Sequence, residues 1–123
     1  MYKVFLDTNV LLDYLCDCRG SVGVAAERLF DSALRGEIEC YIAPHSLTNI
    51  FYIIRKFYNE QTRKNMIGML RRVCKVQTLN DSMIEEALAM KDCDDFEDAL
   101  QIVCARHCKA DEFITRDKAI KSF

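Results

Sequence analysis

The chain has 123 residues, of which 50% are hydrophobic and 29% are charged, with four glycines and one proline. This length and composition predict one globular domain, residues 1–123, that buries a single core and has no low-complexity tract. The net charge of −2 excludes a strongly basic, non-specific nucleic-acid binder, and no apolar run approaches the ~20 residues that cross a bilayer. The first residues lack a signal-peptide pattern, so seven cysteines fit a reducing, cytoplasmic location, and we expect no membrane partner.

Short apolar segments alternate with amphipathic ones along the chain. The apolar segments are rich in β-branched and aromatic residues and are predicted strands at 2–7, 38–44, 75–79 and 111–117. A helical periodicity predicts helices at 8–15, 21–37, 45–58, 61–74, 80–91 and 94–108, and residues 118–123 are expected to form a final turn. Strands that alternate with helices predict an α/β fold on a parallel sheet.

Cap signals and buried stripes accompany several of these helices. Thr8 or Asn9 is expected to cap the first helix, and Asp81 with Ser82 the helix at 80–91. In the helix at 45–58, Ser46 lies near the cap, and the buried stripe is predicted to contain Leu47, Ile50, Ile54 and Phe57.

The segment DDFEDAL, residues 94–100, places four carboxylates within five positions. Asp95 and Asp98 are three residues apart and share one face of a helix, where like charges repel each other. A bound cation would relieve that repulsion. A solvated first turn, whose acids meet the helix dipole, would also explain the segment. The segment taken alone leaves both interpretations open.

Acids from distant parts of the sequence are predicted to meet at one edge of the sheet. Asp7 ends the first strand, Asp117 follows the last strand, and Asp98 begins the helix between strands three and four. Ligands of open α/β sheets bind at the carboxyl ends of the strands, and a buried carboxylate without a partner is costly. The convergence therefore favours a site for a hard divalent cation, which prefers oxygen ligands.

Three motifs, FLDTNVLLDYL (5–15), DFEDALQIVCA (95–105) and FITRD (113–117), resemble the PIN domain, the nuclease fold of VapC-type toxins and many RNA-processing factors. The segment SLTNIFYIIRK (46–56) is similar to the central helix of a prokaryotic subgroup, so the resemblance spans nearly the whole chain. It implies a three-layer α/β/α sandwich with a central parallel sheet of four or five strands. It also implies an endoribonuclease that uses Mg²⁺ or Mn²⁺ to hydrolyse RNA, and a role as the toxin of a toxin–antitoxin pair.

The resemblance assigns roles to single residues. Asp7, Asp98 and Asp117 match the catalytic acids that bind metal, and Asp95 matches a further acid that would hold a second ion or a metal-bound water. Thr115 matches a small hydroxyl residue beside the metal. Such a cation lowers the pKa of an attacking water and neutralises charge that develops on the phosphate. Thr8 and Asn9, next to Asp7 in the sequence, are expected to cap the helix or to orient that acid.

Basic residues are separate from the acids in the sequence and are the candidates for RNA binding. They are Arg55, Lys56, Arg71, Arg72 and Arg116, with Arg63, Lys64 and Lys75 nearby. Such residues attract phosphates, although a charge run of this kind also describes an ordinary solvated face.

One departure from the family pattern leaves two functions open. Many members carry a glutamate in the helix after the second strand, where this chain has Asn49. Asn49 offers a neutral oxygen, so Asp95 or Glu97 would have to restore the charge. The chain is then either an active nuclease or a weakened PIN-like module that binds RNA or a protein partner without cleavage. An antitoxin and a second copy of the chain are the protein partners that the resemblance suggests.

Other site chemistries fit the sequence less well. An aspartyl-phosphate phosphatase needs a second Asp two residues after Asp7, where this chain has Asn9. His45 follows Pro44 at a strand end and is a weak catalytic candidate. A zinc site could be assembled from Cys16, Cys18, Cys104, His107 and Cys108. Paired C-x₂-C spacing is missing, however, so buried packing is favoured for the cysteines.

Overall fold

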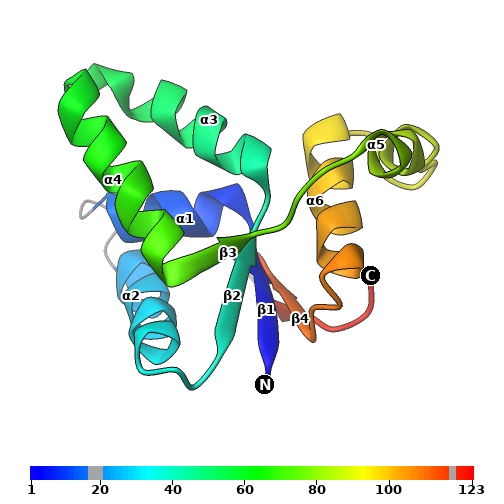
Figure 1. Cartoon of the computed structure of the whole chain (residues 1–123), viewed down its shortest axis with the longest axis horizontal. Helices are drawn as coiled ribbons and strands as arrows, with labels where there is room; N and C mark the ends of the chain where they lie inside the picture. Colours follow the sequence, from blue (N-terminus) through cyan, green and yellow to red (C-terminus); the bar gives the residue numbers. More distant parts are fainter. Residues whose placement is uncertain (17–20, 117–118) are drawn as a thin grey trace.

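The computed structural model describes residues 1–16, 21–116 and 119–123, which form a five-stranded sheet between two layers of helices (Figure 1). The strands are β1 (Lys3–Leu6), β2 (Glu39–Ile42), β3 (Cys74–Val76), β4 (Glu112–Ile114) and β5 (Ala119–Ile120), in the order β3-β2-β1-β4-β5. The first four strands are parallel, and β5 runs antiparallel to β4. The predicted three-layer fold is confirmed, whereas the final turn predicted at 118–123 contains the edge strand β5.

Helices cover both faces of the sheet. On one side lie α1 (Thr8–Leu15), α2 (Ser21–Leu34) and α4 (Glu60–Val73), and the chain reaches α4 through α3 (Pro44–Ile53) and the 3₁₀ helix η2 (Ile54–Lys56). On the other side lie α5 (Asp81–Leu88) and α6 (Phe96–His107) (Figure 1). None of the helices among the described residues is long and apolar enough to pass through a membrane.

The two layers correspond to two hydrophobic clusters that β1 separates. Successive side chains of a strand point to opposite faces, so Val4 and Leu6 pack with α1, α2 and α4 while Phe5 packs with α5 and α6. The Phe5 and Phe113 rings stack on that second face, with centroids 5.5 Å apart. The apolar run of β1 is therefore buried on both sides, as a central parallel strand requires.

The segment predicted as one helix at 45–58 differs from the prediction. The α-helix ends at Ile53 and tightens into η2. Ile50 and Ile54 are buried as predicted, but Phe57 lies at the turn before α4 and is 75% exposed. The predicted burial of Phe57 is wrong because it assumed a helix through residue 58, whereas the helix ends before Phe57.

Several helix caps also differ from the sequence signals. The first helical residue is Thr8 and its N-cap is Asp7, while α5 is capped by Asn80, whose side chain accepts from the Met83 amide at 2.9 Å. At α3 the N-cap is Ala43, and Ser46 is fully buried instead of capping. Each shift is one to three residues, the usual uncertainty of a boundary read from sequence.

The carboxyl ends of β1 and β4 form the edge that positions the candidate site. From β1 the chain steps outward to β2 and β3, and then returns to β4 on the other side of β1. The Asp7 amide donates to the Ile114 carbonyl at 3.0 Å and holds the two strand ends together. Ligands of open α/β sheets bind at such a reversal of strand order.

Candidate metal centre and active site

Asp7 stands at the junction of β1 and α1 with its carboxylate available. Its backbone carbonyl accepts from the Val10 amide at 3.0 Å, but its side chain makes no capping hydrogen bond to α1. The carboxylate of an N-cap aspartate normally accepts hydrogen bonds from the first amides of the helix. Here the carboxylate instead accepts from the Gln101 side chain of α6, which turns it toward the other acids.

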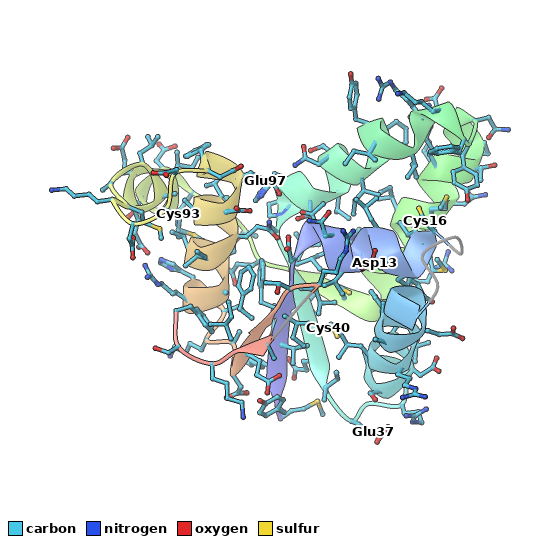
Figure 2. All side chains as sticks on the ribbon, turned by 180° about the vertical axis from the view of Figure 1, so that it is seen from behind. Asp13, Cys16, Glu37, Cys40, Cys93 and Glu97 are labelled. Carbon is cyan, nitrogen blue, oxygen red and sulfur yellow. The ribbon has the colours of Figure 1, made fainter. Side chains whose placement is uncertain are left out.

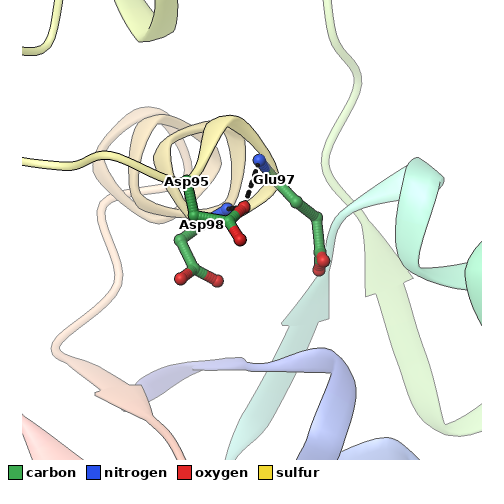
Figure 3. Close-up of side chains that lie close together, drawn as sticks. All are labelled: Asp95, Glu97 and Asp98. Carbon is green, nitrogen blue, oxygen red and sulfur yellow. Dashed lines mark hydrogen bonds between the residues drawn. The ribbon is translucent and has the colours of Figure 1, made fainter.

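The other described acids belong to the first turn of α6. One carboxylate oxygen from each of Asp95, Glu97 and Asp98 lies within 4.8 Å of the other two (Figure 3). Asp95 is the N-cap, and its Oδ1 accepts from the amides of Glu97 at 2.9 Å and Asp98 at 3.2 Å. The sequence did not predict this capping contact, which occupies one of the two Asp95 oxygens and stabilises the turn that carries the cluster.

Gln101 joins the acids of β1 and α6 and was missed by the sequence analysis. It is fully buried, and its Nε2 donates to Asp7 Oδ1 at 3.1 Å and to Glu97 Oε1 at 3.0 Å. Its Oε1 accepts from the Thr8 amide at 3.2 Å. The signal in the sequence is a single amide within the apolar run ALQIVCA, four residues after Glu97 and three after Asp98.

Hydroxyl groups extend this network below the acids. Thr8 Oγ1 donates to Glu97 Oε1 at 3.2 Å and lies 2.8 Å from Ser46 Oγ, so α1, α3 and α6 are linked through three side chains. Figure 2 shows Glu97 at the end of α6 that faces α3. Thr8, expected to cap the helix or to orient Asp7, instead places its hydroxyl on Glu97 and its amide on Gln101.

The surroundings of the cluster disfavour the charged form of two carboxylates. Burial raises the pKa of Glu97, the Thr8 hydroxyl opposes that shift, and the charges of Asp7 and Asp95 add to it. Burial also raises the pKa of Asp98, helped by the charges of Asp95, Asp7 and Glu97. Mutual repulsion of this kind is relieved by a bound cation or a bound proton.

Two recesses meet at Asp7 and Asp98. One, of about 330 Å³, is lined by both acids with Glu97, Asn9 and Asn49, and its α3 wall includes Tyr52. The other, of about 410 Å³, is lined by the same two acids with Thr115 and apolar side chains such as Ile102. Asp7 and Asp98 thus line both recesses, whereas Asn9 and Asn49 line the smaller one and Thr115 lines the larger one.

The last motif contains the predicted residues Arg116 and Asp117. The predicted ligand Asp117 lies outside the described residues. Arg116, expected to bind RNA, is paired with the buried carboxylate of Asp13 on α1, labelled in Figure 2. The Arg116 Nε and Nη2 atoms each donate to one Asp13 oxygen at 3.1 Å. This two-pronged contact gives Arg116 a structural role at the end of β4.

The other four basic residues predicted to bind RNA lie at two separate places. Arg55 and Lys56 are exposed in η2, next to the α3 wall of the smaller recess. Arg71 and Arg72 are exposed in the last turn of α4, and a helix rise of 1.5 Å per residue puts them about 17 Å from the start of that helix. Only the first pair adjoins the acids through α3.

The weaker candidates differ in position, and His107 is exposed with its Nε2 3.2 Å from Glu86 Oε1. Both ring nitrogens of His45 are buried without a hydrogen-bond partner among the described residues, and burial lowers the pKa of this imidazole. Cys104 and Cys108 are buried in the core beside α6, and Cys18 of the rejected zinc motif lies outside the described residues. Within the described chain, the cluster suited to a metal is the acidic one on α6.

A comparison with known families supports the fold. A family model described as PIN domain matches residues 3–119, which is nearly the whole chain. No curated protein matches the chain.

Proposed function

The chain belongs to the PIN-domain family, whose members are generally nucleases that use divalent metal ions, and we propose that it is a Mg²⁺- or Mn²⁺-dependent endoribonuclease. The observation that carries the proposal is the meeting of Asp7, Glu97 and Asp98 in one recess, where the order of the parallel strands reverses. The family match supports the nuclease class, and the acid cluster supports the cofactor.

The donor set fits a hard divalent cation. Its groups are carboxylates, with neutral amide and hydroxyl donors around them and no thiolate or imidazole among the described ligands. Asp7 and Asp98 would hold the ion together with Asp117, and Glu97 would supply further charge. Mg²⁺ and Mn²⁺ favour such oxygen ligands and keep several waters. When bound, the ion supplies Lewis acidity and an acidic water for phosphodiester hydrolysis.

The chain's own residues position that chemistry. The Gln101 amide holds the carboxylates of Asp7 and Glu97 on one side of the recess, and the Thr8 hydroxyl fixes Glu97 from below. Asn9 and Asn49 line the same recess with amide groups that can hydrogen-bond to a phosphate or a ribose. Hydrolysis consumes one water, breaks one P–O bond, and leaves a phosphomonoester and a hydroxyl on the two product strands.

The alternative is a module that binds RNA or a protein partner without cutting, and Asn49 is the observation in its favour. A glutamate at that position would bring charge, whereas Asn49 brings a neutral amide to the recess. Glu97 lines the same recess and would supply the missing charge. We therefore favour the active nuclease, used as the toxin of a toxin–antitoxin pair as in VapC-type proteins.

The decisive experiment measures cleavage of a labelled RNA with Mn²⁺ and with chelator. Asp7→Asn and Asp98→Asn should each lower the rate by at least about 100-fold, because loss of even an outer partner of a metal ligand costs roughly 10- to 100-fold. Asp94→Asn is the matched control, since Asp94 is exposed and outside the described cluster. The Asp94→Asn variant should cut normally.

A cellular readout tests the toxin role with the same variants. Induced expression of the wild type should arrest growth, and Asp7→Asn should not. Cleavage that survives chelation, or that survives Asp98→Asn, would contradict the metal-dependent mechanism. RNA binding by the wild type without any cleavage would favour the binding module.

A further inference from the structure

An exposed aromatic ring stands beside the acids and has no role in the mechanism above. Tyr52 lies on α3, is 61% exposed, and lines the same recess as Asp7 and Asp98. Because Tyr52 is largely exposed, its ring does not pack in the hydrophobic core. Its surface is therefore available to a ligand that enters the recess.

A guanidinium is stacked on this ring. The Arg55 Cζ atom lies 3.6 Å from the Tyr52 ring centroid, and Arg55 Nη1 donates to the Tyr52 carbonyl at 2.8 Å. The hydrogen bond keeps the guanidinium folded back on its own turn, so the two planar groups form one preorganised unit. Such a unit offers a flat polarisable surface and a fixed positive charge.

The charge distribution around the recess selects the ligand. Phosphates are repelled by the carboxylates on one wall and attracted by Arg55 and Lys56 next to the opposite wall. A nucleic-acid strand can use both the basic residues and the Tyr52 ring, because its phosphates can contact Arg55 and Lys56 while one base stacks on the ring. Bases of a duplex already stack on their neighbours, so only an unpaired base has a free face.

We propose that Tyr52, with Arg55 stacked on it, is the binding subsite for one unpaired base of an RNA strand whose adjacent phosphate reaches the acids. This inference rests on the proposed function and adds a specificity element to the same site. The subsite lies on α3, opposite the α6 cluster. A strand bound there is held by stacking on one wall while the other wall presents the acids.

The size of the effect follows from stacking. Removal of one stacking aromatic weakens single-strand binding by about 5- to 150-fold. Tyr52→Ala should show a loss in this range, whereas Tyr52→Phe keeps the ring and should bind as the wild type does. Phe57→Ala is the matched control because Phe57 is 75% exposed after the same helix and is absent from the lining of the recess.

The binding experiment uses a fluorescent, unstructured RNA oligonucleotide and the Asp98→Asn protein, in which the strand stays intact. Tyr52→Ala added to that protein should weaken single-strand binding and leave binding of an RNA duplex unchanged. An oligonucleotide with one abasic position should bind less tightly than the intact strand when Tyr52 is present. The Tyr52→Ala protein should bind these two oligonucleotides equally. In cleavage by the otherwise wild-type enzyme, Tyr52→Ala should raise KM more than it lowers kcat.

Unchanged single-strand affinity in Tyr52→Ala overturns the subsite, and so does an equal loss in Phe57→Ala, which would indicate a general apolar surface for a protein partner. If cleavage depends on Asp7 and Asp98 while Tyr52→Ala behaves normally, the nuclease proposal is supported and the subsite proposal is wrong. If RNA binding depends on Tyr52 but no RNA is cut, the nuclease proposal is wrong and the subsite proposal is supported. Absence of RNA binding by the protein overturns both.

Discussion

Gln101 provides the sharpest test of how the acids are held. Its buried side chain makes three hydrogen bonds, two to the carboxylates of Asp7 and Glu97 and one from the Thr8 amide. Gln101→Leu keeps a side chain of similar volume without polar atoms, so it removes these hydrogen bonds and leaves little cavity. We expect the variant to fold with lower stability and with misplaced carboxylates.

The magnitude follows from the three contacts. The Thr8 amide is buried with its residue and loses its acceptor, which costs about 1–3 kcal/mol. Each lost contact to a partly solvated carboxylate costs about 1 kcal/mol, and burial of leucine in place of an amide offsets about 1 kcal/mol of the total. The net loss is about 3 kcal/mol, which for a domain of this size lowers the melting temperature by about 12 °C.

Urea and thermal unfolding in chelating buffer measure this loss, with Gln61→Leu as the control. Gln61 is exposed on α4 and its amide bonds only Asn65 among the described contacts, so its replacement should change stability by less than about 0.5 kcal/mol. Cleavage by Gln101→Leu should fall by about 10- to 100-fold, as for other groups that orient metal ligands. A Gln101→Leu protein as stable and as active as the wild type would refute the bridging role.

Two further predictions concern charge. The raised pKa values of Glu97 and Asp98 mean that the folded protein binds these protons more tightly than the unfolded chain, so stability in chelating buffer should fall as pH rises above about 4. Thermal melts should show a smaller fall in the Glu97→Gln, Asp98→Asn double variant. Equal slopes of stability against pH in the two proteins would contradict the repulsion. Arg116→Met removes two charge-assisted hydrogen bonds to buried Asp13 and should lower the free energy of unfolding in urea by about 3 kcal/mol. Lys64→Met, in the exposed pair with Glu60, should lower it by less than about 1 kcal/mol. Equal losses would mean that burial does not strengthen the Arg116–Asp13 pair.

The fold could be predicted because its signals are local. Buried parallel strands appear as short apolar runs, and amphipathic segments between them appear as helices, so β1 to β4 and the six α-helices were all expected. The two-residue strand β5 has no such run, since it is held by pairing with β4 at Phe113 and Ile114. Edge pairing of this kind depends on a neighbour that the local sequence does not reveal.

The site was predictable only in part, for the same physical reason. Acids at strand ends converge because parallel strands end at one edge, so Asp7 and Asp98 could be placed together from sequence. The partners of Gln101 and Arg116 lie 94 and 103 residues away, at Asp7 and Asp13. A polar residue on an apolar helix face or after a strand becomes a bridge only when tertiary packing supplies its partner.

The position of the charge explains how the recess tolerates its acids. Asp95, Glu97 and Asp98 belong to the cap and first turn of α6, where free amides and the helix dipole favour negative charge by about 0.3–1 kcal/mol each. Asn49 lies inside α3, where no helix end would offset a carboxylate. The chain therefore places its extra charge on α6, through Glu97, and keeps a neutral amide on α3. That arrangement offsets part of the repulsion among the acids of α6, and a bound cation would relieve the rest.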